Sequence, residues 1–203
     1  MTINILKITV ASFSLFLGTG NMIEAAAART NSHMATTGYT SQPIGHKVFC
    51  QQYRSECKVQ SKKTVATRLN PRRWEEMVEI NNQINLAVEP VTDQEYYNQE
   101  ELWTYPDKYG DCEDYVLLKR YMLMKMGWPA SSLLITVVKQ TTGDGHAVLK
   151  VRTDKADYIL DNLRMKIRPW NKTEYRYLKR QSVKNTGKWS RIRDRRRRLA
   201  QYM

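Results

Sequence analysis

The chain has 203 residues, enough for one domain with tails, and its 41% hydrophobic content excludes wholesale disorder. No run of roughly 18 apolar residues is present, which excludes a polytopic membrane protein, and three cysteines are too few for a disulfide-dense scaffold. The formal net charge of +13 lies in residues 164–203, which hold 15 Lys and Arg against 2 Asp and Glu. This pattern indicates a basic C-terminal segment and not a globally basic groove for nucleic acid.

The first 28 residues have the pattern of an export signal. Lys7 precedes an apolar run over residues 8–17, glycines end that run, and residues 25–28 are four alanines, the small residues that a signal peptidase requires. We therefore predict a signal peptide over residues 1–28, a flexible polar lead over residues 29–42, and a periplasmic or secreted mature protein. A buried helix is the alternative interpretation of the apolar run.

An oxidising compartment changes the interpretation of the cysteines. Cys50 and Cys57 are close in sequence, and such a pair usually forms a disulfide in an exported protein. Two reduced, buried thiols remain the alternative, because spacing alone does not fix the geometry of a disulfide. Cys112 is then left unpaired, which makes it a candidate nucleophile.

Cys112 is predicted to lie at the start of a helix. Acidic residues surround it at positions 111, 113 and 114, and apolar residues follow at helical spacing until Gly127 and Pro129 end the helix. Unpaired N–H groups at a helix N-terminus lower the pKa of a thiol and can hold an oxyanion. The neighbouring carboxylates instead raise the pKa of the thiol, so an imidazolium or a bound metal has to offset them.

His146 and Asp161 lie in two alternating runs that predict a hairpin turning near residues 153–156. A loop made of residues 153 and 154 would place His146 directly opposite Asp161. A turn centred on residues 154 and 155 would pair residue 148 with residue 161 and leave His146 diagonal to Asp161 on the same face, still within side-chain reach. A three-residue loop would put them on opposite faces. The turn at 154 and 155 also gathers five residues on one apolar face: Ala147, Leu149, Val151, Tyr158 and Leu160.

Cys112, His146 and Asp161 together are the parts of a thiol acyl-transfer triad. A cysteine nucleophile needs a base to take its proton, and the base needs a carboxylate that fixes its tautomer. Each residue alone is a weak signal, but a helix start, a strand and a paired strand are each the right element for its role. The sequence therefore predicts a catalytic triad of these three residues.

The three residues lie in the motifs Gly-Asp-Cys-Glu-Asp-Tyr at 110–115, Gly-His-Ala-Val-Leu at 145–149 and Ile-Leu-Asp-Asn-Leu at 159–163. These motifs resemble those of the bacterial transglutaminase-like cysteine proteinases, whose best-known members are LapG-type periplasmic proteases that cut a surface adhesin. That family also has segments similar to two further stretches of the chain, residues 74–85 and 103–106, and a similar cysteine pair. The resemblance runs from about residue 43 to residue 170, which we take as the domain.

The resemblance implies an α+β, papain/transglutaminase-like fold, with the catalytic cysteine at a helix N-terminus packed on an antiparallel sheet that carries the histidine and the aspartate. It implies a cysteine endopeptidase acting on a protein substrate, such as a surface adhesin or another envelope protein, with no organic cofactor. In LapG-type members it also implies calcium beside the cysteine, here at Asp111 and Glu113. The alternative is that these two acids only cap the helix.

The sequence leaves two other functions open. A transglutaminase or amidase forms the same thioester and differs only in its acceptor, and a non-catalytic envelope-binding module could keep the same fold. Residues 171–203 depart from the family pattern as a basic C-terminal extension. We expect this extension to be solvated and partly helical, or to tether the protein to anionic envelope polymers or lipid, with nucleic acid a less favoured partner.

Overall fold

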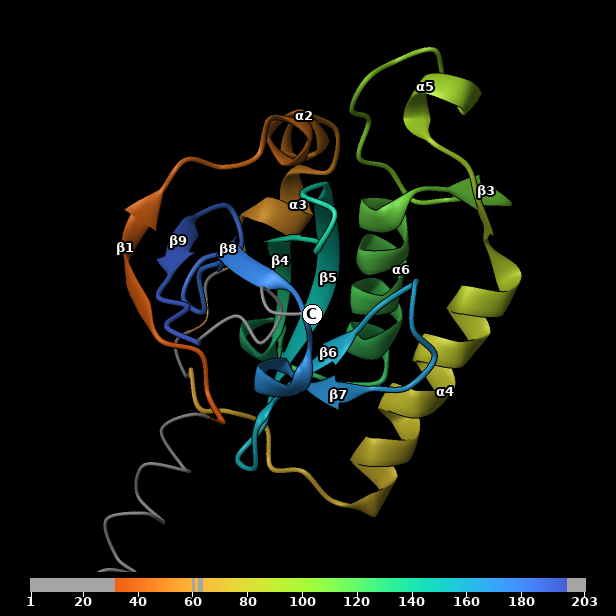
Figure 1. Cartoon of the computed structure of the whole chain (residues 1–203). Helices are drawn as coiled ribbons and strands as arrows, with labels where there is room; N and C mark the ends of the chain where they lie inside the picture. Colours follow the sequence, from red (N-terminus) through yellow and green to blue (C-terminus); the bar gives the residue numbers. More distant parts are fainter. Residues whose placement is uncertain (1–31, 60, 62–63, 197–203) are drawn as a thin grey trace, which may run out of the picture. The chain divides into compact units, whose positions relative to one another are not determined.

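The computed structural model describes residues 32–59, 61 and 64–196, and the predicted signal peptide at 1–28 lies outside them (Figure 1). In the described residues, seven strands form one sheet in the order β1-β9-β8-β4-β5-β6-β7, with every neighbouring pair antiparallel. The strands are β1 (Thr36–Thr40), β4 (Leu133–Lys139), β5 (Gly145–Arg152), β6 (Asp157–Leu160), β7 (Arg168–Pro169), β8 (Arg176–Gln181) and β9 (Trp189–Ile192). A short parallel pair is formed by β2 (Glu89–Pro90) and β3 (Tyr109–Gly110).

The helices precede most of the sheet in the chain, and local capping explains where they begin and end. They are α2 (Ile44–Gln52), α3 (Arg54–Cys57), α4 (Pro71–Ala87), α5 (Asp93–Tyr96) and α6 (Cys112–Lys125), with 3-10 turns η1 (Ala130–Ser132) and η2 (Trp170–Lys172). The side chain of Asn70 accepts the N–H of Arg73 at the start of α4, and a proline occupies the first helical position, where no N–H is needed. Gly127, with φ +82°, ends the α6 segment in the left-handed conformation that favours glycine. None of the described helices is long and apolar enough to cross a membrane.

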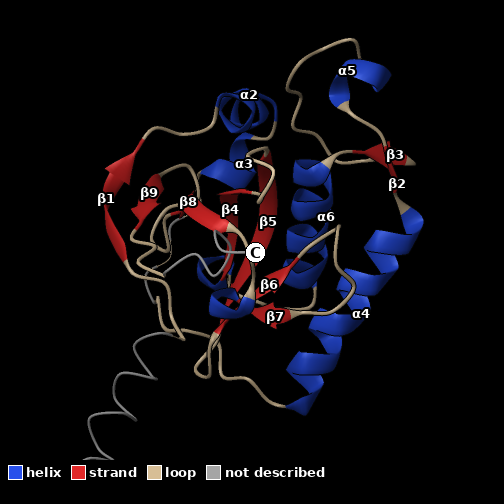
Figure 2. Ribbon diagram, viewed as in Figure 1, coloured by secondary structure: helices blue, strands red, loops and turns tan. Residues whose placement is uncertain are grey.

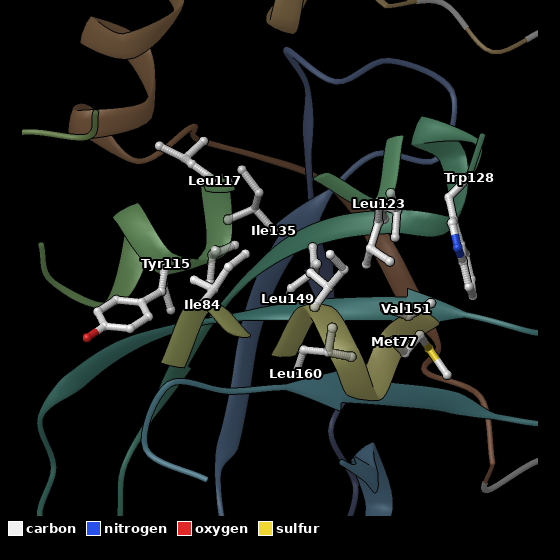
Figure 3. Packing of buried hydrophobic residues seen from close by; sticks show 14 of the residues in the cluster. Met77, Ile84, Tyr115, Leu117, Leu123, Trp128, Ile135, Leu149, Val151 and Leu160 are labelled. Atoms are coloured by element: carbon white, nitrogen blue, oxygen red, sulfur yellow. The ribbon is translucent and has the colours of Figure 1, made fainter. Parts of the chain in front are cut away.

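The main core lies between the sheet and two long helices. Figure 2 shows α6 beside β5, with α4 on the outer side of α6. Leu149 of β5 and Leu160 of β6 pack in one buried cluster with Met77 of α4 and Leu123 of α6 (Figure 3). Because strand residues alternate between faces, the neighbouring Val148 belongs to a second cluster on the opposite face. This arrangement fixes α6, and with it Cys112, against the strand that carries His146.

The hairpin of β5 and β6 has the register centred on residues 154 and 155, one of the two that the sequence left open. Leu149 pairs with Leu160 and Arg152 pairs with Asp157. Thr153 closes the turn, because its hydroxyl donates to the carbonyl of Ala156 at 2.8 Å and accepts backbone N–H groups of the same turn. The predicted apolar face is confirmed, since its members are buried in the main core or packed against it: Ala147, Leu149, Val151, Tyr158 and Leu160.

The predicted domain limits at residues 43 and 170 are too narrow. Strand β1 lies within the predicted flexible lead over residues 29–42, and β8 and β9 lie within the predicted C-terminal extension over residues 171–203, yet all three belong to the central sheet. The expectation of a solvated, partly helical extension is therefore wrong for residues 176–192. The basic composition concealed the strands, because long side chains such as those of Lys and Arg can pack their alkyl stems on apolar surface. Tyr177, Arg180 and Gln181 of β8 are all buried.

Candidate active site

Cys112 is the first residue of α6, as predicted from the sequence. Asp111 precedes the helix in extended conformation, with φ −104° and ψ −167°. The backbone N–H of Ala147 in β5 donates to the Cys112 Sγ at 3.3 Å. This contact fixes the thiol against the strand, one residue from His146.

His146 and Asp161 are brought together by the hairpin. His146 Nε2 lies 2.9 Å from Asp161 Oδ1, and the two residues are 5% and 3% exposed. The diagonal placement on one face is the geometry expected for the register centred on residues 154 and 155. Because Nε2 contacts the carboxylate, Nδ1 is the ring nitrogen left for exchange of a proton with a thiol.

The Asp161 carboxylate is held in its ionised form. Burial alone would raise the pKa of Asp161, but hydrogen bonds from His146 and Tyr175 outweigh burial and hold this pKa below its ordinary value. Tyr175 donates its hydroxyl to Asp161 Oδ2 at 2.5 Å, and the N–H of Leu163 donates to Oδ1 at 3.1 Å. An ionised carboxylate in this position stabilises an imidazolium on His146.

The Cys112 thiol has an unfavourable environment for ionisation. Burial raises its pKa well above the ordinary value, and the charges of Glu113 and Asp111 raise it further. The thiol donates a hydrogen bond to Glu113 Oε2 at 3.1 Å. Burial and these charges therefore oppose the lowering effect of the helix N-terminus, which is the conflict that the sequence predicted.

Three carboxylates form a cluster beside Cys112. Ligand oxygens of Asp93, Asp111 and Glu113 all lie within 4.8 Å of one another. Burial, together with the charges of neighbouring carboxylates, raises the pKa of Asp111 to about 6 and that of Glu113 to about 9, and burial raises the pKa of Asp93. Asp111 Oδ1 is buried without a hydrogen-bond partner among the described residues. Several carboxylate oxygens converging on one point, one of them unpaired, fit a hard divalent cation such as calcium.

Two residues near the site were missed by sequence reasoning. Asp93 lies in the first turn of α5, far from Cys112 in sequence, and no motif linked it to Cys112. Tyr175 lies in the segment assigned to a basic extension, and no motif marked it. Both contacts depend on tertiary packing and not on local pattern.

The structure joins Cys50 to Cys57 by a disulfide, the pairing expected from the sequence. The bridge links α2 to α3, and Cys112 is the free cysteine of the described chain. His46 also lies against the disulfide, with Nδ1 3.6 Å from the Cys50 Sγ. Because the two sulfurs are bonded to each other, they are not thiolate ligands for a metal.

Comparisons with known proteins identify the family of the chain. Residues 36–197 match the family model of the bacterial transglutaminase-like cysteine proteinases. No curated protein matches the chain. The matched range covers most of the chain and contains the whole seven-stranded sheet of the described residues.

Three solved structures of LapG from Legionella pneumophila are similar to the chain. The first has 25% identity and a TM-score of 0.48, covering 57% of this chain and 66% of that one. The calcium-bound form has 22% identity and a TM-score of 0.48, covering 69% and 77%, and the EGTA-treated form has 22% and 0.41, covering 56% and 64%. The chain thus spans just under two-thirds of the length of the first of these. The match over residues 36–197 shows that the chain belongs to the bacterial transglutaminase-like cysteine proteinase family.

Proposed function

We propose that the protein is a periplasmic cysteine endopeptidase that cuts a protein substrate with Cys112, His146 and Asp161. The observation that carries this proposal is the 2.9 Å contact between His146 and Asp161, next to an Ala147 amide that contacts the Cys112 sulfur. These contacts support the proposal, because they join His146 to Asp161 and join the neighbouring residue of the His146 strand to the helix start at Cys112. Membership of a cysteine proteinase family agrees with this use of the three residues.

The mechanism follows from the chemistry of these groups. His146 takes the proton of the Cys112 thiol, and the sulfur attacks the peptide carbonyl. The backbone N–H of Cys112, at the helix start, donates to the oxyanion. His146 then protonates the leaving amine, and water, deprotonated by His146, hydrolyses the thioester and regenerates the thiol. Asp161 holds the Nε2 proton throughout, which fixes the tautomer and stabilises the imidazolium.

Calcium fits this site as an accessory ion. Asp111 and Glu113, with Asp93 as a third ligand, would hold it through carboxylate oxygens. When bound, the ion supplies positive charge beside Cys112 and so favours the thiolate. The proposal rests on the cluster of buried carboxylates and the unpaired Asp111 oxygen in this chain. Glu113 would exchange its hydrogen bond with the thiol for the ion.

We further propose that the substrate is a surface adhesin or another envelope protein. The apolar run followed by four alanines at residues 8–28 and the disulfide both favour the periplasm.

Basic residues of β8 and β9 are the surface for contact with anionic envelope polymers or lipid. Arg176, Lys179 and Arg191 line a groove there of about 330 Å³.

The decisive experiment compares envelope proteins from cells that carry the wild-type protein, Cys112→Ala or no protein. We expect a cleaved envelope protein only with the wild type, and we expect purified wild-type enzyme with calcium to reproduce the cleavage. The double variant Cys112→Ala/His146→Ala should be about as inactive as either single variant, because the residues act as a unit. Asp161→Asn should lose less activity than Cys112→Ala while keeping the fold.

The alternatives give different results. Incorporation of a labelled amine without release of a fragment would identify a transglutaminase. In calcium, iodoacetamide should modify Cys112 faster than an ordinary thiol near pH 6, and His146→Ala should slow that reaction. A Cys112 that reacts no faster than an ordinary thiol, together with the absence of any fragment that depends on Cys112, would overturn the proposal and leave a binding module.

A further inference from the structure

Asp161 is contacted by side chains outside the triad from two other parts of the fold. Its Oδ2 accepts the hydroxyl of Tyr175, as described above. Its backbone N–H donates to Asn81 Oδ1 of α4 at 3.2 Å, and the same Asn81 oxygen accepts Lys119 Nζ of α6 at 2.9 Å. Asn81 and Lys119 are both 0% exposed, and Tyr175 is 5% exposed. The carboxylate that orients His146 is thus held at its side chain and at its backbone.

Lys119 is unfavourable for stability in this position. Its completely buried ammonium donates a hydrogen bond to the neutral amide of Asn81, and the Tyr115 ring lies 5.8 Å away. Burying a cation without a directly bonded carboxylate is costly, and an apolar side chain of similar size would avoid that cost. Burial lowers the pKa of Lys119 to about 7, and the nearby charge of Asp161 opposes that change. A residue kept at a cost to stability is a candidate for a role in function.

Lys119 follows Cys112 by seven residues in α6, which is about two helical turns. The two side chains therefore share one face of the helix, the face that packs on the hairpin of His146 and Asp161. Asn81 is held independently, because its amide nitrogen donates to the carbonyl of Met165 at 3.0 Å. Its oxygen is thereby fixed between the ammonium and the backbone of Asp161.

The backbone around Tyr175 is also held in place. Its carbonyl accepts a hydrogen bond from Arg196, and the adjacent Glu174 forms an ion pair with Arg164 at 2.5 Å. The tyrosine ring lies 5.5 Å from the ring of His146. With Oδ2 bonded to Tyr175, the Asp161 carboxylate presents Oδ1 to His146 and cannot rotate without breaking a buried hydrogen bond.

We propose that Tyr175 and Lys119 are positioning residues for the reaction, Tyr175 by fixing the Asp161 carboxylate directly and Lys119 by holding the same residue through Asn81. This inference rests on the proposed function, because it assumes that Asp161 orients His146 for proton transfer. It adds two residues to the site that are not themselves the nucleophile, the base or the orienting carboxylate. Loss of either should loosen the contact of His146 with Asp161 while the fold remains.

The test of Tyr175 uses Tyr175→Phe with Tyr177→Phe as a matched control. Tyr177 is a buried tyrosine of the adjoining strand whose hydroxyl lies 2.8 Å from Thr173 Oγ1. Two readouts in calcium need no known substrate: the rate at which iodoacetamide modifies Cys112 at pH 6, and the NMR resonance of the His146 Nε2 proton, assigned by its loss in His146→Ala. We expect Tyr175→Phe to slow alkylation about tenfold and to shift or broaden the resonance, and Tyr177→Phe to change the rate less than about twofold.

A double-mutant cycle shows whether Tyr175 acts through Asp161. In an Asp161→Asn background, Tyr175→Phe should slow alkylation by less than about twofold more, because the acceptor it positions is already altered. Equal effects of Tyr175→Phe and Tyr177→Phe, or full additivity in the cycle, would overturn the role of Tyr175. Cleavage that survives Cys112→Ala overturns the proposed function itself, so the two failures are distinguishable.

Lys119→Met gives an independent signature. It removes the ammonium and keeps an unbranched side chain of similar length, so we expect an unchanged or higher melting temperature together with slower alkylation and a shifted His146 resonance. A structural residue would give the opposite result. Lys119→Met protein that melts lower or fails to fold, or that keeps the wild-type resonance and rate, would overturn the role of Lys119.

Discussion

Arg196→Ala should destabilise the fold far more than Arg195→Ala, although both remove one positive charge. Arg196 Nη1 donates to the carbonyls of Trp170 and Thr173, both at 2.9 Å, and Nη2 donates to the carbonyl of Tyr175. The guanidinium also pairs with Asp194 at 2.7 Å and lies 4.7 Å from the centroid of the Trp170 ring. Arg196 therefore holds the segment that leads from η2 into β8.

The magnitude follows from these contacts. A hydrogen bond that involves a charged group contributes about 1.5–3 kcal/mol, but water can replace part of the loss because the Arg196 side chain is 17% exposed. We therefore expect Arg196→Ala to lower the free energy of unfolding by about 3 kcal/mol in total, and not by the sum over all its bonds. Arg195 is exposed, and its replacement should change that free energy by less than about 0.5 kcal/mol.

Urea unfolding of the wild type and the two variants measures the difference. For a domain of this size, a loss of about 3 kcal/mol corresponds to roughly 6–12 °C in the melting temperature. Arg195→Ala controls for net charge, because it changes the charge by the same amount at the next position. If the two variants unfold within about 0.5 kcal/mol of each other, Arg196 does not hold this segment and the reasoning is refuted.

Two further predictions concern the metal and the disulfide. In chelator, the free energy of unfolding should fall as the pH rises from about 4 to 9, because folding raises the pKa values of Asp111, Glu113 and Asp114 and the unfolded chain releases their protons first. Calcium should reduce this dependence on pH, and Asp111→Asn should weaken the effect of calcium. A free energy of unfolding that is the same with and without calcium at every pH would contradict the metal site. Replacing both Cys50 and Cys57 with serine should cost about 2–3 kcal/mol, measured by urea unfolding, because the disulfide closes a short loop with a sequence separation of 7. Peptide mapping without reductant should show the same pair joined, and a bridge to Cys112 would contradict the assignment.

The site could be predicted from the sequence where local pattern determines geometry. A change in the turn by one residue moves every side chain of a strand to the other face, so the apolar alternation of the hairpin restricted His146 and Asp161 to one face. The helix start at Cys112 was predictable for a similar reason, since Gly127 and Pro129 limit the other end of the helix. These features depend on the sequence within one helix or one hairpin, and not on contacts between distant segments.

The residues that support the triad could not be predicted in this way. Asn81 and Tyr175 bond Asp161 from separate parts of the chain, and Lys119 bonds Asn81. All three side chains are polar, and a hydrophobic pattern assigns polar side chains to the surface. The same error placed β8 in a solvated tail. Its sequence contains three basic residues, and a composition count cannot show that Arg180 is buried while Arg176 is exposed.

The charges around the site explain how Cys112 can act as a nucleophile although carboxylates surround it. Carboxylates beside Cys112 raise the pKa of its thiol, whereas the hydrogen bonds to Asp161 lower the pKa of that carboxyl and keep it ready to stabilise an imidazolium. For a proton transfer from Cys112 to His146, Asp161 thus stabilises the protonated acceptor, whereas the carboxylates beside Cys112 destabilise the thiolate that the donor becomes. A cation at the carboxylate cluster would lie next to the thiol, because Glu113 of that cluster contacts the Cys112 sulfur, whereas Asp161 is bonded to His146 and Tyr175. On this basis the reactivity of Cys112 should depend on calcium, while the contact between His146 and Asp161 should persist without it.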